Sequence, residues 1–124
     1  MYKIDESIDF TPLLNNELVH VCISLVSVIL VLSNKSYVLT NITLQCKYKI
    51  WQNGSIILSG HGEKEVDKSK ILVCLLGKYV ESVDVIDSDT LRLNFSDNYS
   101  LDLIDDSDMY ESFVISGEIF GLIV

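Results

Sequence analysis

Five histidine and cysteine side chains are the first candidates for chemistry in this sequence: His20, Cys22, Cys46, His61 and Cys74. His20 and Cys22 are two residues apart, so on a β-strand they would point to the same face. Imidazole and thiolate are zinc ligands, but the spacing lacks the paired elements of a zinc finger. A cysteine in an apolar strand is usually a small core residue. A metal-binding or small-ligand β-domain using His20, Cys22 and Cys46 therefore remains an alternative.

Catalysis by a cysteine needs a thiolate beside a base that a third group orients. His61 lies between Gly60 and Gly62 in a predicted turn, and no sequence motif pairs it with a cysteine. The sequence also has no glycine-rich phosphate loop, serine-elbow motif or metalloprotease helix. We therefore expect a protein that is not an enzyme and that uses no cofactor.

Acidic side chains are concentrated in the second half of the chain. Residues 77–118 contain eleven acidic residues and two basic ones, whereas residues 11–62 contain three lysines and one glutamate. The run Asp105-Asp106-Ser107-Asp108 lacks the ligand pattern of an EF-hand calcium loop. Carboxylates beside tyrosines instead form a candidate partner-binding surface. Its candidate residues are Asp84, Asp87, Asp89, Tyr99, Asp102, Asp105, Asp106, Asp108, Tyr110 and Glu111.

The overall charge restricts the class of partner. The formal net charge is −9 and the sequence pI is about 4.4, which argues against direct binding to nucleic acid phosphates. An acidic surface suits a basic protein, because complementary fields accelerate encounter and disfavour wrong partners. The other interpretation is a solvated face that keeps a small domain soluble.

Length and composition indicate one folded domain, residues 1–124. The chain has 124 residues and 48% hydrophobic residues, enough for a single core. Three cysteines without disulfide or metal-finger spacing favour a reducing compartment. Residues 1–10 are acidic, whereas an export signal is basic, so we expect a cytoplasmic protein.

The segment Leu18 to Asn34 carries no formal charge and approaches the length of a membrane-spanning helix. An internal repeat argues against that interpretation. When residues 13–40 are placed over residues 75–103, with one extra residue in the second copy, Leu18 falls on Val80 and Leu32 on Phe95. The second copy has several aspartates in the corresponding stretch, which a bilayer core would not accept. Both copies are thus predicted to be β-structure, with no membrane contact.

The local patterns predict individual strands and turns. Leu91, Leu93 and Phe95 alternate with polar residues, which is the period of a half-buried strand. Asn53-Gly54 and Asp97-Asn98 are typical of tight hairpin turns. We further predict a helix over residues 63–77, a short helix beginning at Thr11-Pro12, and a closing strand pair over residues 110–124 tied into the core.

The predicted fold is therefore mainly β, in the α+β class. Two similar antiparallel β-meander units, about residues 13–60 and 75–124, form a sandwich or a partly open barrel with one connecting helix. Asn15 of the first unit stands opposite Gly77 of the second, which is a departure between the two copies.

Three segments carry a resemblance to a known family: Leu75-Leu76-Gly77-Lys78-Tyr79-Val80-Glu81-Ser82-Val83, then Leu91-Arg92-Leu93-Asn94-Phe95 with the turn Ser96-Asp97-Asn98, and Tyr110-Glu111-Ser112-Phe113. In these segments the chain resembles an uncharacterised bacterial domain-of-unknown-function family. It is also similar to immunity proteins of bacterial toxin systems, including contact-dependent growth inhibition. That resemblance implies a cytoplasmic protein that binds and neutralises one cognate toxin domain.

The leading functional hypothesis is a non-enzymatic immunity protein whose acidic surface covers the basic site of a toxin domain such as a nuclease. We expect a monomer or a weak homodimer. Besides the metal-binding or small-ligand domain, a second alternative is a structural or oligomerising module. It is suggested by the apolar strands of the first unit, which could pair at an exposed edge.

Overall fold

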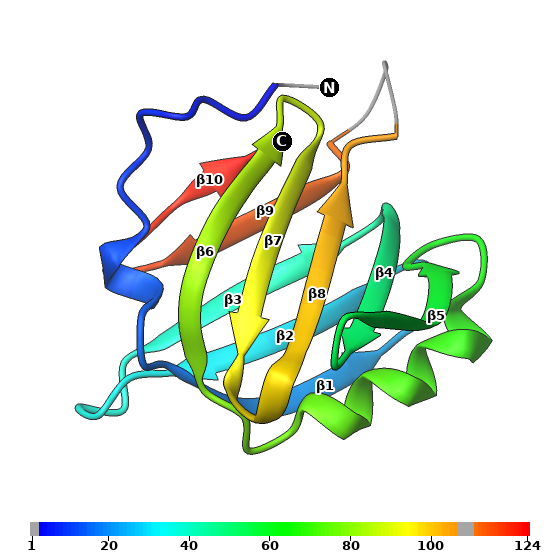
Figure 1. Cartoon of the computed structure of the whole chain (residues 1–124), viewed down its shortest axis with the longest axis horizontal. Coiled ribbons are helices and arrows are strands. Elements are labelled where there is room, and N and C mark those ends of the chain that lie inside the picture. The colour runs from blue at the N-terminus through cyan, green and yellow to red at the C-terminus, as the bar shows by residue number, and fades with distance from the viewer. Residues whose placement is uncertain (1–2, 107–110) are drawn as a thin grey trace.

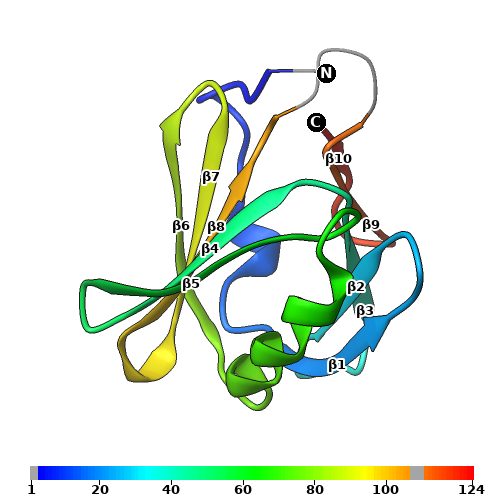
Figure 2. The ribbon, with the colours of Figure 1, turned by 90° about the vertical axis from the view of Figure 1, so that its right-hand side faces the viewer.

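The computed structural model describes residues 3–106 and 111–124. They form two five-stranded antiparallel sheets that face each other as a sandwich (Figures 1 and 2). The first sheet has the order β1-β2-β3-β9-β10 and comprises β1 (Glu17–Ile23), β2 (Val28–Ser33), β3 (Leu39–Leu44), β9 (Phe113–Gly117) and β10 (Leu122–Ile123). The second sheet has the order β5-β4-β8-β7-β6 and comprises β4 (Lys47–Gln52), β5 (Ser55–His61), β6 (Val80–Asp87), β7 (Thr90–Phe95) and β8 (Tyr99–Ile104). The predicted fold class is confirmed.

The helical elements are 3-10 helices. The helix predicted over residues 63–77 is present as η2 (Val66–Leu75), and the short helix at Thr11-Pro12 is η1 (Thr11–Leu13). A third, η3 (Ser96–Asn98), forms the turn before β8. Helix η2 packs against β1 and β5 and buries Leu72 and Leu75 completely. In the described part of the chain, no helix has the length and hydropathy needed to cross a membrane.

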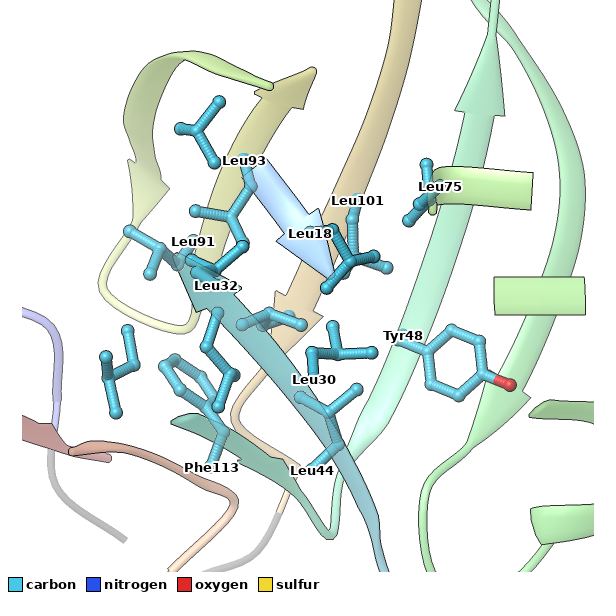
Figure 3. Packing of buried hydrophobic residues seen from close by; sticks show 14 of the residues in the cluster. Leu18, Leu30, Leu32, Leu44, Tyr48, Leu75, Leu91, Leu93, Leu101 and Phe113 are labelled. Carbon is cyan, nitrogen blue, oxygen red and sulfur yellow. The ribbon is translucent and has the colours of Figure 1, made fainter. Parts of the chain in front are cut away.

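The core forms from the alternate side chains that point between the sheets. Leu91, Leu93 and Phe95 of β7 are buried, while Arg92 and Asn94 between them point outward, as the alternation predicts. Leu30 and Leu32 of β2 lie on the side of the core opposite Leu91 and Leu93 (Figure 3). The uncharged segment from Leu18 to Asn34 is thus a β-hairpin that supplies one side of this core.

The predicted units exchange strands. Strands β1–β3 and β6–β8 are both meanders, one in each sheet. The next hairpin of each unit crosses over: β4 and β5 join the sheet of β6–β8, and β9 and β10 join the sheet of β1–β3. In these added pairings, Leu44 lies opposite Phe113 in the first sheet, and Tyr48 lies opposite Leu103 in the second. Each sheet therefore contains strands from both predicted units.

Equivalent irregularities occur in both units. The β1–β2 register shifts between Leu18 and His20, and the β6–β7 register shifts between Val80 and Ser82, which occupy the corresponding positions. Asn15 and Gly77 both have positive φ, 63° and 80°. The Asn15 N–H donates to the Val80 carbonyl at 2.7 Å, and the Gly77 N–H donates to the Leu18 carbonyl at 2.9 Å. The aligned Asn15 and Gly77 thus share one backbone role, which favours the predicted duplication.

Candidate functional site

The structure places the predicted site residues in three separate regions. We call the first the acidic end; it contains Asp87, Asp89, Asp105, Asp106 and Glu111. Asp84 and Asp102 lie on the outer face of the second sheet, and Tyr99 begins β8 at the opposite end of that strand. Asp108 and Tyr110 lie outside the described residues. The described candidates therefore do not form one continuous surface.

The acidic end is built by the β6–β7 turn, the end of β8 and the N-terminal segment, which meet at one edge of the sandwich (Figure 1). The Asp105 N–H donates to the Asp89 carbonyl at 2.7 Å, and the Ile4 N–H donates to the Ser88 carbonyl at 3.0 Å. Asp5 and Glu6 follow Ile4 and are exposed. The N-terminal segment thus adds carboxylates that the charge count of the second unit did not include.

Lys3 lies among these carboxylates. Its Nζ forms an ion pair with Asp89, and it lies 3.8 Å from Oδ2 of Asp105. The Asp105 side chain is only 2% exposed, and its Oδ1 accepts a hydrogen bond from the Ser112 hydroxyl at 2.7 Å. Asp105 is therefore a structural carboxylate that joins β8 to the segment before β9. The other carboxylates of this end, Asp87, Asp89, Asp106 and Glu111, are at least partly exposed.

His61 is held in place by Asp106 and by its own turn. Its Nε2 lies 3.0 Å from Oδ2 of Asp106, and its Nδ1 accepts the N–H groups of Glu63 and Lys64 at 3.1 Å each. Because Nδ1 accepts hydrogen bonds, the proton of the neutral ring lies on Nε2, which donates to Asp106. Both nitrogens are thus occupied within the chain, and His61 orders the turn that leads into η2.

On the outer face of the second sheet, Asp102 is the centre of a compact ion-pair cluster. Arg92 donates to both of its carboxylate oxygens, from Nε at 2.6 Å and from a terminal nitrogen at 2.9 Å, and Trp51 Nε1 donates at 2.9 Å. The Arg92 guanidinium also lies 5.2 Å from the centre of the Trp51 ring. The hydrogen bonds to Asp102 raise the pKa of Arg92 above its ordinary value. Because Arg92 neutralises Asp102 within the sheet, Asp102 adds little attraction for an external cation.

A second row of polar side chains runs beside this cluster. Asn94 donates to Asp84 at 2.7 Å and to the Ser82 hydroxyl at 3.0 Å, and it accepts from the Ser100 hydroxyl at 2.8 Å. At the other end of β8, the Tyr99 hydroxyl accepts from Gln52 at 3.1 Å, and Lys78 lies 5.6 Å from the ring centre. Tyr99 is thus separated from the acidic end by the length of the strand.

Trp51, Arg92 and Asn94 are site residues that the sequence pattern alone does not select. The available signal is that these side chains occupy outward-facing positions of their strands. Arg92 lies opposite Asp102 in the β7–β8 pair, and Trp51 lies opposite Ser100, two residues before Asp102 on β8. Predicting this cluster requires knowing that β4 lies beside β8, which follows from the strand exchange. Trp and Arg are frequent anchors of protein interfaces, so this face is a second candidate contact area.

The candidate metal and thiol residues do not assemble. Across residues 3–106 and 111–124, no three His, Cys, Asp or Glu side chains are placed to hold a metal ion. Cys46 is completely buried, and burial raises the pKa of its thiol to about 12. His20 and Cys22 share a face as predicted, but they are exposed on the outside of the first sheet rather than facing Cys46. At neutral pH Cys46 is therefore a protonated core residue.

Compared with known proteins, the chain matches no protein-family model, no curated protein and no solved structure.

Proposed function

We propose that this chain is a non-enzymatic binding protein that neutralises a basic partner, a bacterial toxin domain, by covering the partner's positive surface with the acidic end. The single observation that supports this most is the convergence of three chain segments at that end. The N-terminal segment, the β6–β7 turn and the end of β8, to which Ser112 is hydrogen-bonded, all bring carboxylates there, with Lys3 as a described partner cation.

Electrostatics gives this arrangement a physical role in binding. A toxin that cleaves nucleic acid needs a positive groove for the phosphates, and clustered carboxylates can occupy such a groove. Opposite charges across an interface increase the association rate and make it depend on salt. The Trp51–Arg92–Asp102 cluster provides a less charged contact area on the adjoining sheet face. The proposed location is the cytoplasm, where such a toxin acts on its producer.

Affinity capture with matched baits tests the proposal. The wild-type chain is compared with a triple variant of the acidic end, Asp87→Asn, Asp89→Asn and Glu111→Gln, in lysate of the organism that encodes the chain. We expect the wild type to retain one basic protein at low salt and to release it at high salt. The captured protein should arrest growth when produced alone, and co-production of the wild-type chain should restore growth.

The control variant removes the same number of charges away from the acidic end: Glu17→Gln, Glu81→Gln and Glu118→Gln. It should capture the partner and restore growth like the wild type, whereas the acidic-end variant should do neither. Equal capture by both variants, or a captured protein without toxicity, would contradict the proposal. Thermal melting of each bait shows that it is folded.

A further inference from the structure

Each sheet has two edge strands, β1 and β10 in the first and β5 and β6 in the second, and β1 and β6 occupy equivalent positions. Strand β1 ends the first sheet and β6 ends the second, and the two strands correspond in the repeat. Figures 1 and 2 show them on opposite layers of the sandwich. An edge strand presents unpaired backbone N–H and C=O groups, which can pair with another chain unless the sequence prevents it.

Strand β6 carries the features that protect an edge. It contains Glu81, Asp84 and Asp87, and its pairing with β7 has two register shifts, one near each end of the strand. Charged side chains and bulges are common devices against edge-to-edge pairing. Strand β6 is thus an edge strand that is protected against pairing, and β1 can be compared with it.

Strand β1 lacks most of these features. Glu17 at its start is bridged to Tyr79, and from Leu18 to Asn34 the chain has no formally charged residue. Its pairing with β2 has one register shift, before His20. Beyond that shift, Ile23 is 44% exposed, and in the following turn Leu25 and Val26 are 90% and 60% exposed. The edge over residues 19–23 is therefore uncharged, regular and continued by an apolar turn.

We propose that the β1 edge pairs with the β1 edge of a second copy of this chain. Two β1 strands running antiparallel are related by a twofold axis, so each copy contributes the same surface and the assembly closes as a dimer. The pairing would join the two first sheets into one continuous sheet.

Charge is the reason to choose a second copy as the occupant. The chain carries a net charge of −9, so two copies repel each other through acidic surfaces. An interface between identical surfaces must be compatible with itself in charge, and the β1 edge meets this condition because it has no charge. A basic partner gains nothing from this edge and is attracted instead to the acidic end, which leaves both surfaces usable at once.

Salt should act on this association in the direction opposite to its effect on the proposed toxin complex. Screening reduces repulsion between two acidic chains, so self-association should strengthen as salt is added. Binding of a basic partner by carboxylates should weaken under the same conditions. The two proposals can therefore fail independently of each other.

Sedimentation equilibrium over a concentration series tests the dimer. We expect the wild-type mass to rise from 14.0 kDa toward twice that value with concentration, and more readily at high salt. Ile23→Lys should weaken association by about tenfold or more, because pairing would bury the new charge. The control is Ile86→Lys on β6, where the parent side chain is 48% exposed, and it should associate like the wild type. A mass of 14.0 kDa at all concentrations, or equal association of both variants, would overturn the proposal.

A spin label on Cys22 gives a readout that does not depend on these substitutions. Cys22 is exposed on β1, Cys46 is buried, and Cys74→Ser removes the remaining half-buried thiol. Labels on two paired β1 strands should broaden each other's spectra, and mixing with unlabelled protein should remove the broadening. A sharp spectrum at concentrations where the mass has doubled would overturn β1 pairing.

Discussion

At the residue scale, the Asp102 carboxylate is the polar group on which the second sheet's outer face most depends. It is 3% exposed and accepts three hydrogen bonds from Arg92 and Trp51. We expect Asp102→Ala to lower the free energy of unfolding by about 2 kcal/mol or more, because it leaves Arg92 and the Trp51 N–H without their acceptor. Asp84→Ala, at an exposed carboxylate of the same face, should cost less than about 1 kcal/mol. Urea unfolding measures both; equal losses would show that Asp102 has no special role.

The Cys46 thiol should produce a pH-dependent stability. Burial raises its pKa from 9.0 to about 12, so the unfolded chain loses this proton at lower pH than the folded chain does. The stability that results from this pKa difference is fully present below about pH 9 and is lost between about pH 9 and 12. Over that range the free energy of unfolding falls by up to about 1.4 kcal/mol per pH unit. Cys46→Ala should remove this component. Parallel stability curves for the two proteins over that range would refute the prediction.

At the element scale, the C-terminal residues complete the first sheet. Val124 is fully buried and exchanges backbone hydrogen bonds with Phe113, and the Phe120 ring lies 5.5 Å from that of Phe10. We expect deletion of residues 119–124 to cost about 3 kcal/mol or more of unfolding free energy, from lost apolar burial and hydrogen bonds. Ile123→Ser, at a side chain that is 50% exposed, is the mild control. An unchanged melting temperature after the deletion would contradict this role.

Most elements are predictable from the sequence because their signals are local. Alternation identifies β7, and both residues of Asn53-Gly54 and of Asp97-Asn98 adopt the positive φ that their turns require. The type of the connecting helix is less predictable. The apolar stripe of an α-helix recurs every three to four residues, whereas the buried residues of the 3-10 helix η2, Ser69, Leu72 and Leu75, are three apart. The cluster around Asp102 is harder still, because Trp51 reaches it from a strand about fifty positions away.

At the scale of the whole molecule, the repeat predicts which positions are equivalent but not which sheet each hairpin joins. The buried and exposed positions of β4 and β9 would be the same whether each strand stayed with its own unit or crossed over. The acidic candidates lie in separate regions for a similar reason, since their surroundings depend on which elements lie beside them. Asp102 lies in the middle of a strand and meets Arg92, whereas Asp87 ends β6 and Asp89 lies in the following turn, which the N-terminal segment joins.

The central claim is that the acidic end binds a basic partner, and the salt dependence of that binding tests it most directly. Titration calorimetry of the captured partner, repeated over a series of salt concentrations, gives the slope of log Kd against log salt for each chain. We predict a steep slope for the wild type and for the Glu17, Glu81 and Glu118 control, and a weaker affinity with a flatter slope for the Asp87, Asp89 and Glu111 variant. Three equal affinities and slopes would contradict the account, because the carboxylates of the acidic end would then take no part in binding.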